Sequence, residues 1–225
     1  MPNTITGYDD YLIDHLNDSL ARATSIRIIV AFLMESGVRL IIGALAEAAR
    51  RGIPIKILTG TYMSITEPSA VYHILNQLGQ AVEIRFFTDS VRSFHPKAYI
   101  IDSGDDGEVF IGSSNLSKSA LTSGVEWNYR LRRSQAPEDY DEFAATFDSL
   151  FAHCAAPVTE AALKAYAVSW KKPVYSRIES PWLLPRQEKP EPFGAQIEAL
   201  YYLDRARAEG LTKGLVIAAT GATSQ

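Results

Sequence analysis

The sequence predicts an α/β fold, a mixed, largely parallel sheet flanked by helices on both faces. Between residues 25 and 87, short β-branched runs alternate with segments of helical spacing, which is typical of βαβ units. After residue 94 this alternation gives way to two apolar runs joined by Gly and Asp, which is typical of a β-hairpin. A chain of 225 residues with 47% apolar content can bury one sizeable core.

The N-terminal part of the chain supplies the alternating helices and strands. The expected helices carry apolar residues at helical spacing, and Gly or Pro marks several of their ends. The expected strands are continuous apolar runs, as in a sheet buried on both faces. We expect helices over residues 8–23, 38–51 and 71–78, and strands over residues 25–32, 55–61 and 82–87.

The remaining elements follow in the C-terminal part. Five prolines between residues 171 and 192 predict a linker, so we place domain boundaries after residue 170 and after residue 192. The hairpin is expected over residues 95–101 and 109–111, around the turn sequence SGDDG. Further strands are expected over residues 125–132 and 215–218, and helices over residues 116–121, 137–154, 159–170 and 195–209.

Composition narrows the class of protein. The net charge of −4 gives no global electrostatic case for nucleic acid or an anionic membrane, so any phosphate-binding surface must be local. Cys154 is the only cysteine, which excludes an intramolecular disulfide and a thiolate metal cluster. The N-terminus lacks a signal-peptide pattern, and the apolar runs are too short to span a bilayer. We therefore expect a soluble, cytoplasmic protein.

One hairpin carries the residue types that phosphoryl chemistry needs. His95 and Lys97 are two apart on a predicted strand, so both side chains face the same way. Ser113 and Asn115 have the same spacing on the next strand or just past its end, within reach of the first pair. Lys97 would neutralise phosphate charge, Ser113 and Asn115 would donate hydrogen bonds, and Glu126 would accept one from the imidazole.

A non-catalytic interpretation of the same residues is the alternative. A His-x-Lys triplet alone is common by chance and would normally be a solvated hairpin edge. The catalytic interpretation is favoured here because all five residue types agree in spacing and chemistry. His15, His73 and His153 lack a lysine two residues later, and we expect surface or packing roles for them.

The motif HPKAYIID resembles the H-x-K-x4-D motif of the phospholipase D superfamily, with His95, Lys97 and Asp102 at its defined positions. The following GSSN resembles that family's G-S-x-N element, and Glu126 its downstream glutamate. The resemblance implies a phospholipase D-like fold over residues 1–170 and a double displacement without metal or other cofactor. In that mechanism one histidine forms a phosphohistidine, a second protonates the leaving oxygen, and Asp102 is a structural support.

The family's active site uses two such motifs, and this chain has one. Single-motif members resemble bacterial nucleases that dimerise, so the resemblance implies a homodimer with one site shared across its axis. Each chain would contribute the same five side chains, from His95, Lys97, Ser113, Asn115 and Glu126.

The C-terminal residues carry a second resemblance. The segment PFGAQIEALYYL…GLTKGLVIAATG resembles the opening of a superfamily 2 helicase of the DEAD/DEAH type, with Gln196 as its adenine-reading glutamine. A Walker A loop needs a Lys, but Gly221 is followed only by ATSQ. Residues 193–225 would thus be the truncated start of an ATPase domain that uses ATP only in a longer protein. An ordinary helix and strand is the alternative.

The helicase resemblance and the single motif favour DNA as substrate, in a restriction or defence system. Two alternatives stay open: a phospholipid phosphodiesterase, and an inactive DNA-binding or dimerisation module of a helicase. Basic residues around the motif are candidates for contacts to DNA phosphates, although each could equally be a solvated rim. They are Arg85, Arg92, Lys118, Arg130, Arg132 and Arg133.

Overall fold

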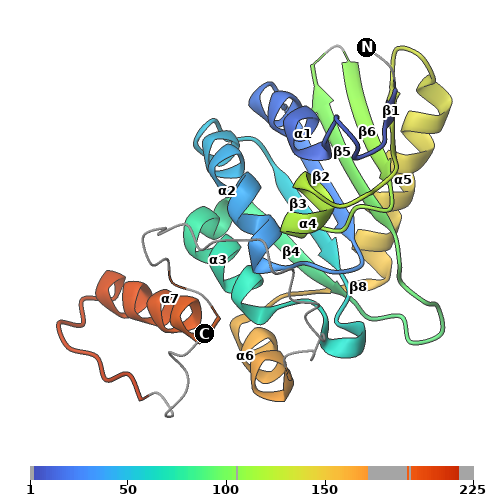
Figure 1. The fold of residues 1–225 in the computed structure, drawn as a ribbon. Coiled ribbons are helices and arrows are strands. Elements are labelled where there is room, and N and C mark those ends of the chain that lie inside the picture. The colour runs from blue at the N-terminus through green and yellow to red at the C-terminus, as the bar shows by residue number, and fades with distance from the viewer. Residues whose placement is uncertain (1–2, 105, 172–191, 193, 218–225) are drawn as a thin grey trace, which may run out of the picture.

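The chain folds around one eight-stranded mixed sheet (Figure 1). The computed structural model describes residues 3–104, 106–171, 192 and 194–217. The strands lie in the order β1-β7-β6-β5-β2-β3-β4-β8. Their bounds are Thr4–Ile5 (β1), Ser25–Val30 (β2), Ile55–Thr59 (β3), Val82–Phe87 (β4), Lys97–Ser103 (β5), Asp106–Gly112 (β6), Asn128–Arg132 (β7) and Ala155–Pro157 (β8).

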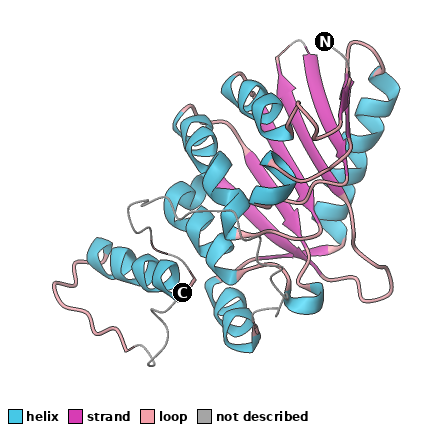
Figure 2. Ribbon diagram, in the orientation of Figure 1, coloured by secondary structure: helices cyan, strands magenta, loops and turns pink. Residues whose placement is uncertain are grey.

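Helices cover both faces of this sheet, as the sequence predicts (Figure 2). The long helix α5 (Pro137–His153) packs on one face, where Tyr140 and Phe147 join a core with Leu58 and Ile100. The larger core lies on the other face, beneath the remaining helices. These are α1 (Leu12–Ala21), α2 (Glu35–Arg50), α3 (Pro68–Leu78), α4 (Lys118–Thr122), α6 (Glu160–Ser169) and α7 (Ala195–Ala208).

The sheet is less parallel than predicted. Of its seven strand pairings, β2–β3 and β3–β4 are parallel and the other five are antiparallel. The βαβ units do form the two parallel pairs. The difference arises after β4, because the β5–β6 hairpin has a tight turn, which joins only antiparallel neighbours. The hairpin then adds to the free edge of β2, antiparallel to it, so that β2 lies between both kinds of neighbour.

The sequence did not predict two short strands, and it predicted one strand that does not form over the described residues. β1 and β8 have two and three residues, which is too short for any periodicity to reveal them. No strand forms over residues 215–217, where Leu215 is 85% exposed and has no neighbouring strand among the described residues. Residue 218 and the proline-rich residues 172–191 lie outside the described residues, so the linker stays a prediction.

The predicted helix over residues 195–209 is confirmed as α7. It packs on α3, where the hydroxyls of Tyr72 and Tyr202 form a hydrogen bond of 3.0 Å, and its own Ile197 is buried. Among the described helices, none combines the length and the apolar character needed to cross a bilayer.

Strand register brings several chain segments together at one end of the strands, the edge of the sheet where β2 and β3 have their carboxyl ends. The last residue of β2, Val30, lies beside Thr59 at the end of β3 and beside Lys97 at the start of β5. Gly112 at the end of β6 lies beside Asn128 at the start of β7. The carboxyl ends of parallel strands, next to a change in strand order, are where α/β proteins place their sites.

Candidate active site

His95 and Lys97 lie together at this edge of the sheet. The Lys97 ammonium is 2.7 Å from His95 Nδ1 and 3.0 Å from its carbonyl oxygen. The exposed imidazole packs edge-on against Phe32, with ring centroids 5.7 Å apart. His95 precedes the strand on which it was predicted, because Pro96 lacks the N–H that a ladder pairing needs. The two side chains nevertheless meet.

The Lys97 ammonium is partly withdrawn from water. Burial lowers the pKa of Lys97, and the negative charge of Glu126 opposes that shift only in part. Among the described residues Lys97 forms no ion pair, so its charge lacks a direct partner. A half-buried cation of this kind favours an anion such as a phosphate beside it.

Asn115 is oriented by the backbone at the end of β2. Its Oδ1 accepts a hydrogen bond of 3.0 Å from the N–H of Phe32, which leaves both Nδ2 donors without a partner in the described structure. The chain after β6 is held there by a bond of 3.0 Å from Met34 N–H to the Leu116 carbonyl. Gly37 permits this approach, because a Cβ there would overlap the Leu116 carbonyl group.

Glu126 binds Ser113, not His95, and this corrects one prediction. The Ser113 hydroxyl donates to Glu126 Oε2 and accepts from the N–H of Trp127 at 3.0 Å. The pairing of β6 with β7 ends at Gly112 and Asn128, and the Ser113 N–H then donates to the Trp127 carbonyl at 3.1 Å. This bond brings the adjacent Glu126 to the Ser113 hydroxyl, whereas His95 comes from the loop before β5. Gly112 is required in this pairing, because a Cβ there would overlap the Trp127 carbonyl oxygen.

The second serine of the GSSN element is structural. Ser114 is buried, donates to the Ala120 carbonyl at 3.2 Å and accepts from Asn128 Nδ2 at 2.9 Å. The residue that sequence reasoning missed is Phe32, which orients Asn115 through its N–H and supports His95 through its ring. No sequence signal marks it, because it reaches the site only through the pairing of β2 with β5.

Asp102 lies at the opposite end of β5 from the site. Its carboxylate accepts from Arg27 Nη1 at 2.7 Å and from the Tyr140 hydroxyl at 2.6 Å. Burial, reinforced by the bond to Asp102, raises the pKa of Tyr140. Five residues of strand separate Asp102 from Lys97, about 16 Å at 3.3 Å per residue. These contacts tie β5 to α5 and fit a supporting role.

Arg130 and Arg132, predicted to contact DNA phosphates, lie elsewhere. Arg130 is 8% exposed, and its Nε donates to Glu108 at 2.8 Å; Arg132 Nε lies 3.8 Å from the same carboxylate. The Ser19 hydroxyl also donates to Glu108. Alternation along β7 turns the Arg130 side chain into the protein, where it meets Glu108 beside Ser19 of α1.

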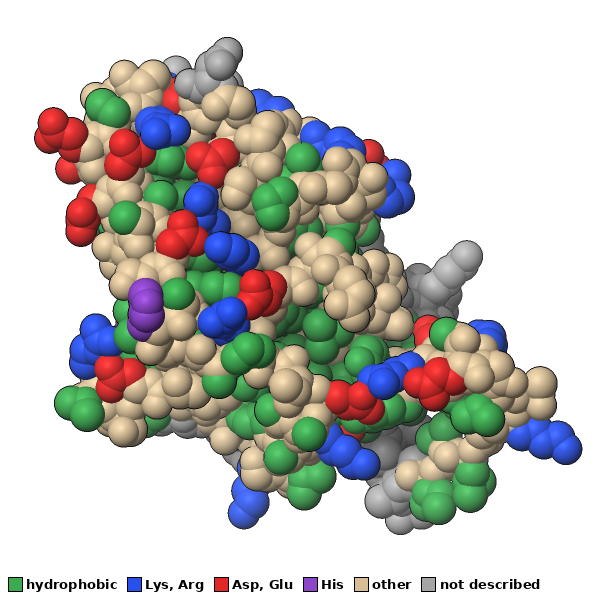
Figure 3. All heavy atoms as spheres, turned by 180° about the vertical axis from the view of Figure 1, so that it is seen from behind, with side chains coloured by type: hydrophobic (Ala, Val, Ile, Leu, Met, Phe, Trp, Pro, Cys, Tyr) green, Lys and Arg blue, Asp and Glu red, His purple; other side chains and the backbone are tan. Residues whose placement is uncertain are grey.

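The other predicted phosphate contacts divide into two groups. Arg85 pairs with Glu83 and donates to the Phe151 carbonyl at 2.8 Å, and Arg133 pairs with Asp141, so both have structural partners. Arg92 pairs with Asp89 at 2.7 Å but is exposed, as is Lys118, and the two lie three residues from His95 and from Asn115 in the sequence. The face seen in Figure 3 carries acidic and basic side chains interspersed, with no large patch of one sign.

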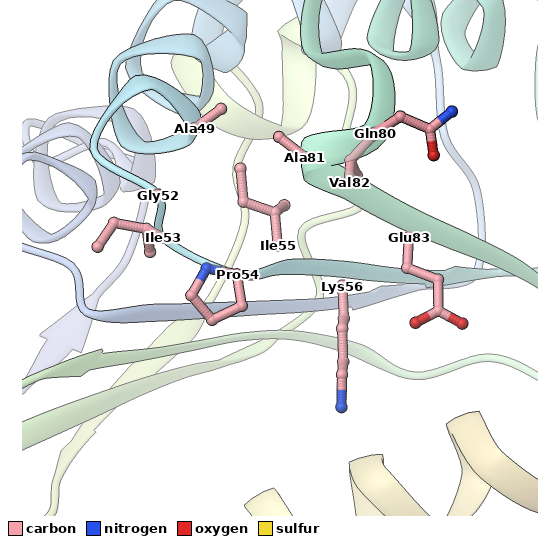
Figure 4. A pocket seen from close by; sticks show the side chains of 10 residues that line it. All are labelled: Ala49, Gly52, Ile53, Pro54, Ile55, Lys56, Gln80, Ala81, Val82 and Glu83. Carbon is pink, nitrogen blue, oxygen red and sulfur yellow. The ribbon is translucent and has the colours of Figure 1, made fainter.

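A separate hollow of about 350 Å³ opens at the opposite end of β3 and β4 (Figure 4). Its charged side chains already have partners: Lys56 Nζ lies 3.1 Å from Asp148, and Glu83 pairs with Arg85. We therefore do not assign it to the site. No three His, Cys, Asp or Glu side chains of the described residues gather in a group that could hold a metal ion.

Comparison with solved structures supports this fold. NucT from Helicobacter pylori is 19% identical over 65% of this chain and 91% of its own, with a TM-score of 0.51. Phosphatidylserine synthase from Haemophilus influenzae is 12% identical over 70% of this chain and 41% of its own, with a TM-score of 0.53. Nuc from Salmonella typhimurium, a phospholipase D family member, is 20% identical over 65% of this chain and 90% of its own, with a TM-score of 0.49.

Sequence comparison gives the family. No curated protein matches the chain. The profile of the family described as cardiolipin synthase, PLD-like domain, matches residues 12–153, which include every residue of the proposed site. The chain therefore belongs to the phospholipase D-like family.

Proposed function

We propose that the chain is a phosphodiesterase that cleaves DNA with His95 as its nucleophile. The observation that carries this proposal is the contact of 2.7 Å between His95 and Lys97, together with the Nδ2 donors of Asn115, which have no partner among the described residues. An exposed imidazole, a partly desolvated cation and two neutral donors are the groups that nucleophilic phosphoryl transfer requires. Membership of the phospholipase D-like family supports a phosphodiesterase activity.

The reaction would proceed in two displacements. An imidazole nitrogen of His95 bonds to phosphorus while the bond to the leaving oxygen breaks, and a second histidine gives that oxygen a proton. Water then attacks phosphorus, its proton returns to the second histidine, and the N–P bond breaks. Lys97 and Asn115 would stabilise negative charge on the non-bridging oxygens, and the Ser113–Glu126 pair would hold the end of β6 beside them.

The second histidine would come from another copy of the chain. His15 belongs to α1 and bonds to Asp10 at 2.6 Å, His73 belongs to α3, and His153 is the last residue of α5. Among the described residues, the ring nitrogens of His15 and His153 lie against Asp10 and Ser149, not against His95. A two-fold homodimer would place His95 of the partner subunit across the scissile phosphate.

The proposal of DNA as substrate rests on the C-terminal sequence. Its likeness to the start of a helicase, including Gln196 on α7, favours a nuclease joined in cis to an ATP-dependent motor. Arg92 and Lys118 would contact DNA phosphates near the site. The hydrolysis itself would use no cofactor.

A phospholipid phosphodiesterase is the second candidate, favoured by the fold shared with a phosphatidylserine synthase. Cleavage of DNA and of phospholipid vesicles, both measured in EDTA, separates the two. We expect the 225-residue chain to cleave DNA. The cleavage rate of His95→Ala should be lower by a factor of about 100 or more, and that of His153→Ala should equal the rate of the parent. Cleavage that EDTA abolishes, or that His95→Ala retains, would overturn the mechanism. Turnover of phospholipid alone would select the second candidate.

A further inference from the structure

A cavity of about 620 Å³ opens directly beside His95, which forms part of its lining. Two loops build the rest, residues 60–62 after β3 and residues 88–94 after β4, together with Phe87 at the end of β4. The second loop extends beyond the sheet in Figure 1, between β4 and β5. We call this cavity the loop pocket. Its volume lies within the range of about 300–1,000 Å³ that is typical of small-ligand sites.

The walls of the loop pocket are aromatic and aliphatic. Phe94 stacks on Phe87 with ring centroids 4.5 Å apart and planes within 22°. Gly60 leaves room for this stack, since a Cβ there would lie 3.1 Å from Phe94 Cδ1. Tyr62 is 72% exposed and Val91 is 92% exposed, although both are large and apolar. Apolar surface left open beside a nucleophile indicates contact with substrate.

The loop after β4 is ordered by its own hydrogen bonds. Asp89 Oδ1 accepts from the N–H groups of Val91 at 2.9 Å and Arg92 at 3.3 Å, and Asp89 Oδ2 accepts from Arg92 Nε at 2.7 Å. The N–H of Thr88 donates to the Cys154 carbonyl at 3.0 Å. The loop therefore presents a fixed rim that offers both hydrogen-bond donors and acceptors.

The loop after β3 is held from the other side by α6 and the residue that follows it. Trp170 Nε1 donates to the Ser64 carbonyl at 2.6 Å, and the Tyr166 hydroxyl donates to the Thr66 carbonyl at 2.7 Å. Ser64 adopts a φ of 54°, a conformation that non-glycine residues rarely take without support. The aromatic side of the loop pocket is thus also fixed in advance.

We propose that the loop pocket receives a nucleobase next to the scissile phosphate, so that the chain acts on single-stranded nucleic acid. This inference rests on the proposed phosphodiesterase activity at His95. Flat aromatic walls with a rim of donors and acceptors suit a base, which offers a π face and a polar edge. An acyl chain would meet the charged Asp89–Arg92 rim instead of a continuous apolar channel. A base within a duplex is stacked and paired, so it would first have to be unpaired and flipped out, which favours a single strand.

Binding without turnover tests the inference. Fluorescence anisotropy would measure the Kd of the His95→Ala chain for a dT oligonucleotide, its duplex, and an all-abasic oligonucleotide of equal length. We expect the dT strand to bind most tightly. Tyr62→Ala, added to His95→Ala, should weaken dT binding about tenfold, because one lost base stack is worth roughly that factor, and leave abasic binding unchanged. Tyr8→Ala, an exposed tyrosine outside the loop pocket, is the matched control.

Each outcome decides the inference. Equal Kd values for the dT and abasic strands, tighter binding of the duplex, or no effect of Tyr62→Ala would overturn it. If Tyr62→Ala weakens binding to phosphatidylglycerol vesicles and not to the dT strand, the loop pocket would be a lipid site, and this too would overturn the inference. Val91→Ala, at a fully solvated side chain, guards against a folding defect in Tyr62→Ala and should also weaken dT binding. Because no cleavage is measured, these results do not depend on whether the parent chain hydrolyses DNA.

Discussion

At the scale of single residues, the partial burial of Lys97 affects both the stability of the fold and the proposed reaction. Its pKa is lowered below the ordinary 10.5 by burial, while the charge of Glu126 opposes the shift. Between the folded and unfolded pKa values the unfolded chain binds more protons, so stability should rise with pH across that window. Urea unfolding of the parent up to pH 10.5 should show this rise, and Lys97→Met should lack it. An equal rise in both proteins would contradict the assignment. The same variant should lose activity, because no cation remains beside the phosphate.

Replacing Asp102 should lower the stability of the fold and leave the catalytic rate unchanged. Asp102→Ala leaves Arg27 and the Tyr140 hydroxyl without their acceptor, which should cost about 1–3 kcal/mol of unfolding free energy. Its kcat, measured well below its Tm, should stay close to that of the parent. Chemical denaturation and single-turnover cleavage measure the two effects. A loss of kcat in a fully folded Asp102→Ala would place this carboxylate in the reaction.

The motif identifies the chemical groups of the site, and pairing decides how they meet. The sequence predicts His95, Lys97, Ser113 and Asn115 as candidate residues because their types and spacing suit phosphoryl chemistry. The bond from Ser113 to Glu126 could not be predicted, since it depends on the register of β6 with β7. For the same reason the motif gives no sign of the Phe32 N–H that orients Asn115.

At the scale of elements, the first turn of α2 sets the position of Asn115. Gly37→Ala would push α2 away from the Leu116 carbonyl, one residue beyond Asn115, and should lower both stability and activity. Gly43→Ala in the same helix is the control, because a Cβ there meets nothing. That change should raise stability by about 0.5–1 kcal/mol. Thermal unfolding and DNA cleavage of both variants test this, and equal behaviour would refute it.

A buried ionic cluster joins α1, β6 and β7 around Glu108. Burial alone would raise the pKa of Glu108, but hydrogen bonds from Ser19 and Arg130 and the charges of Arg130 and Arg22 lower it overall. Glu108→Gln should destabilise the fold by about 3–5 kcal/mol, because the buried Arg130 loses its partner. Glu47→Gln, at an exposed pair with Arg50, should cost at most about 1 kcal/mol.

The pH dependence of this cluster provides a second check. Because the pKa of Glu108 is lowered, its contribution is present above the ordinary value of 4.5 and is lost as pH falls through the folded value. The free energy of unfolding, measured with urea between pH 7 and pH 3, should therefore fall less steeply for Glu108→Gln than for the parent. Parallel curves would contradict this assignment.

Element types could largely be predicted from the sequence, and strand direction could not. The helices and the strands β2 to β7 follow from hydrophobic spacing and from Gly and Pro at their ends. The antiparallel addition of β5 to β2 is a tertiary choice, made when the hairpin covers the free edge of β2. That choice brings Lys97 beside the end of β2, and so creates the site.

At the scale of the whole molecule, one chain presents half of the proposed site on an open edge. Light scattering at assay concentration should give twice the mass of the 24.8 kDa chain. Mixing His95→Ala with excess parent chain should leave partial activity, in proportion to the parent–parent dimers that remain. A monomeric mass in an active preparation would contradict the shared site.

The most direct measurement is a search for the phosphohistidine itself. The chain would be reacted with a labelled phosphodiester, quenched at alkaline pH within one turnover, digested, and examined by mass spectrometry. We predict an adduct on His95 in which the phosphorus keeps the second ester group of the substrate. It should be absent from His95→Ala and retained in His153→Ala. An adduct on another residue, or full cleavage by His95→Ala, would contradict the assignment of His95 as the nucleophile.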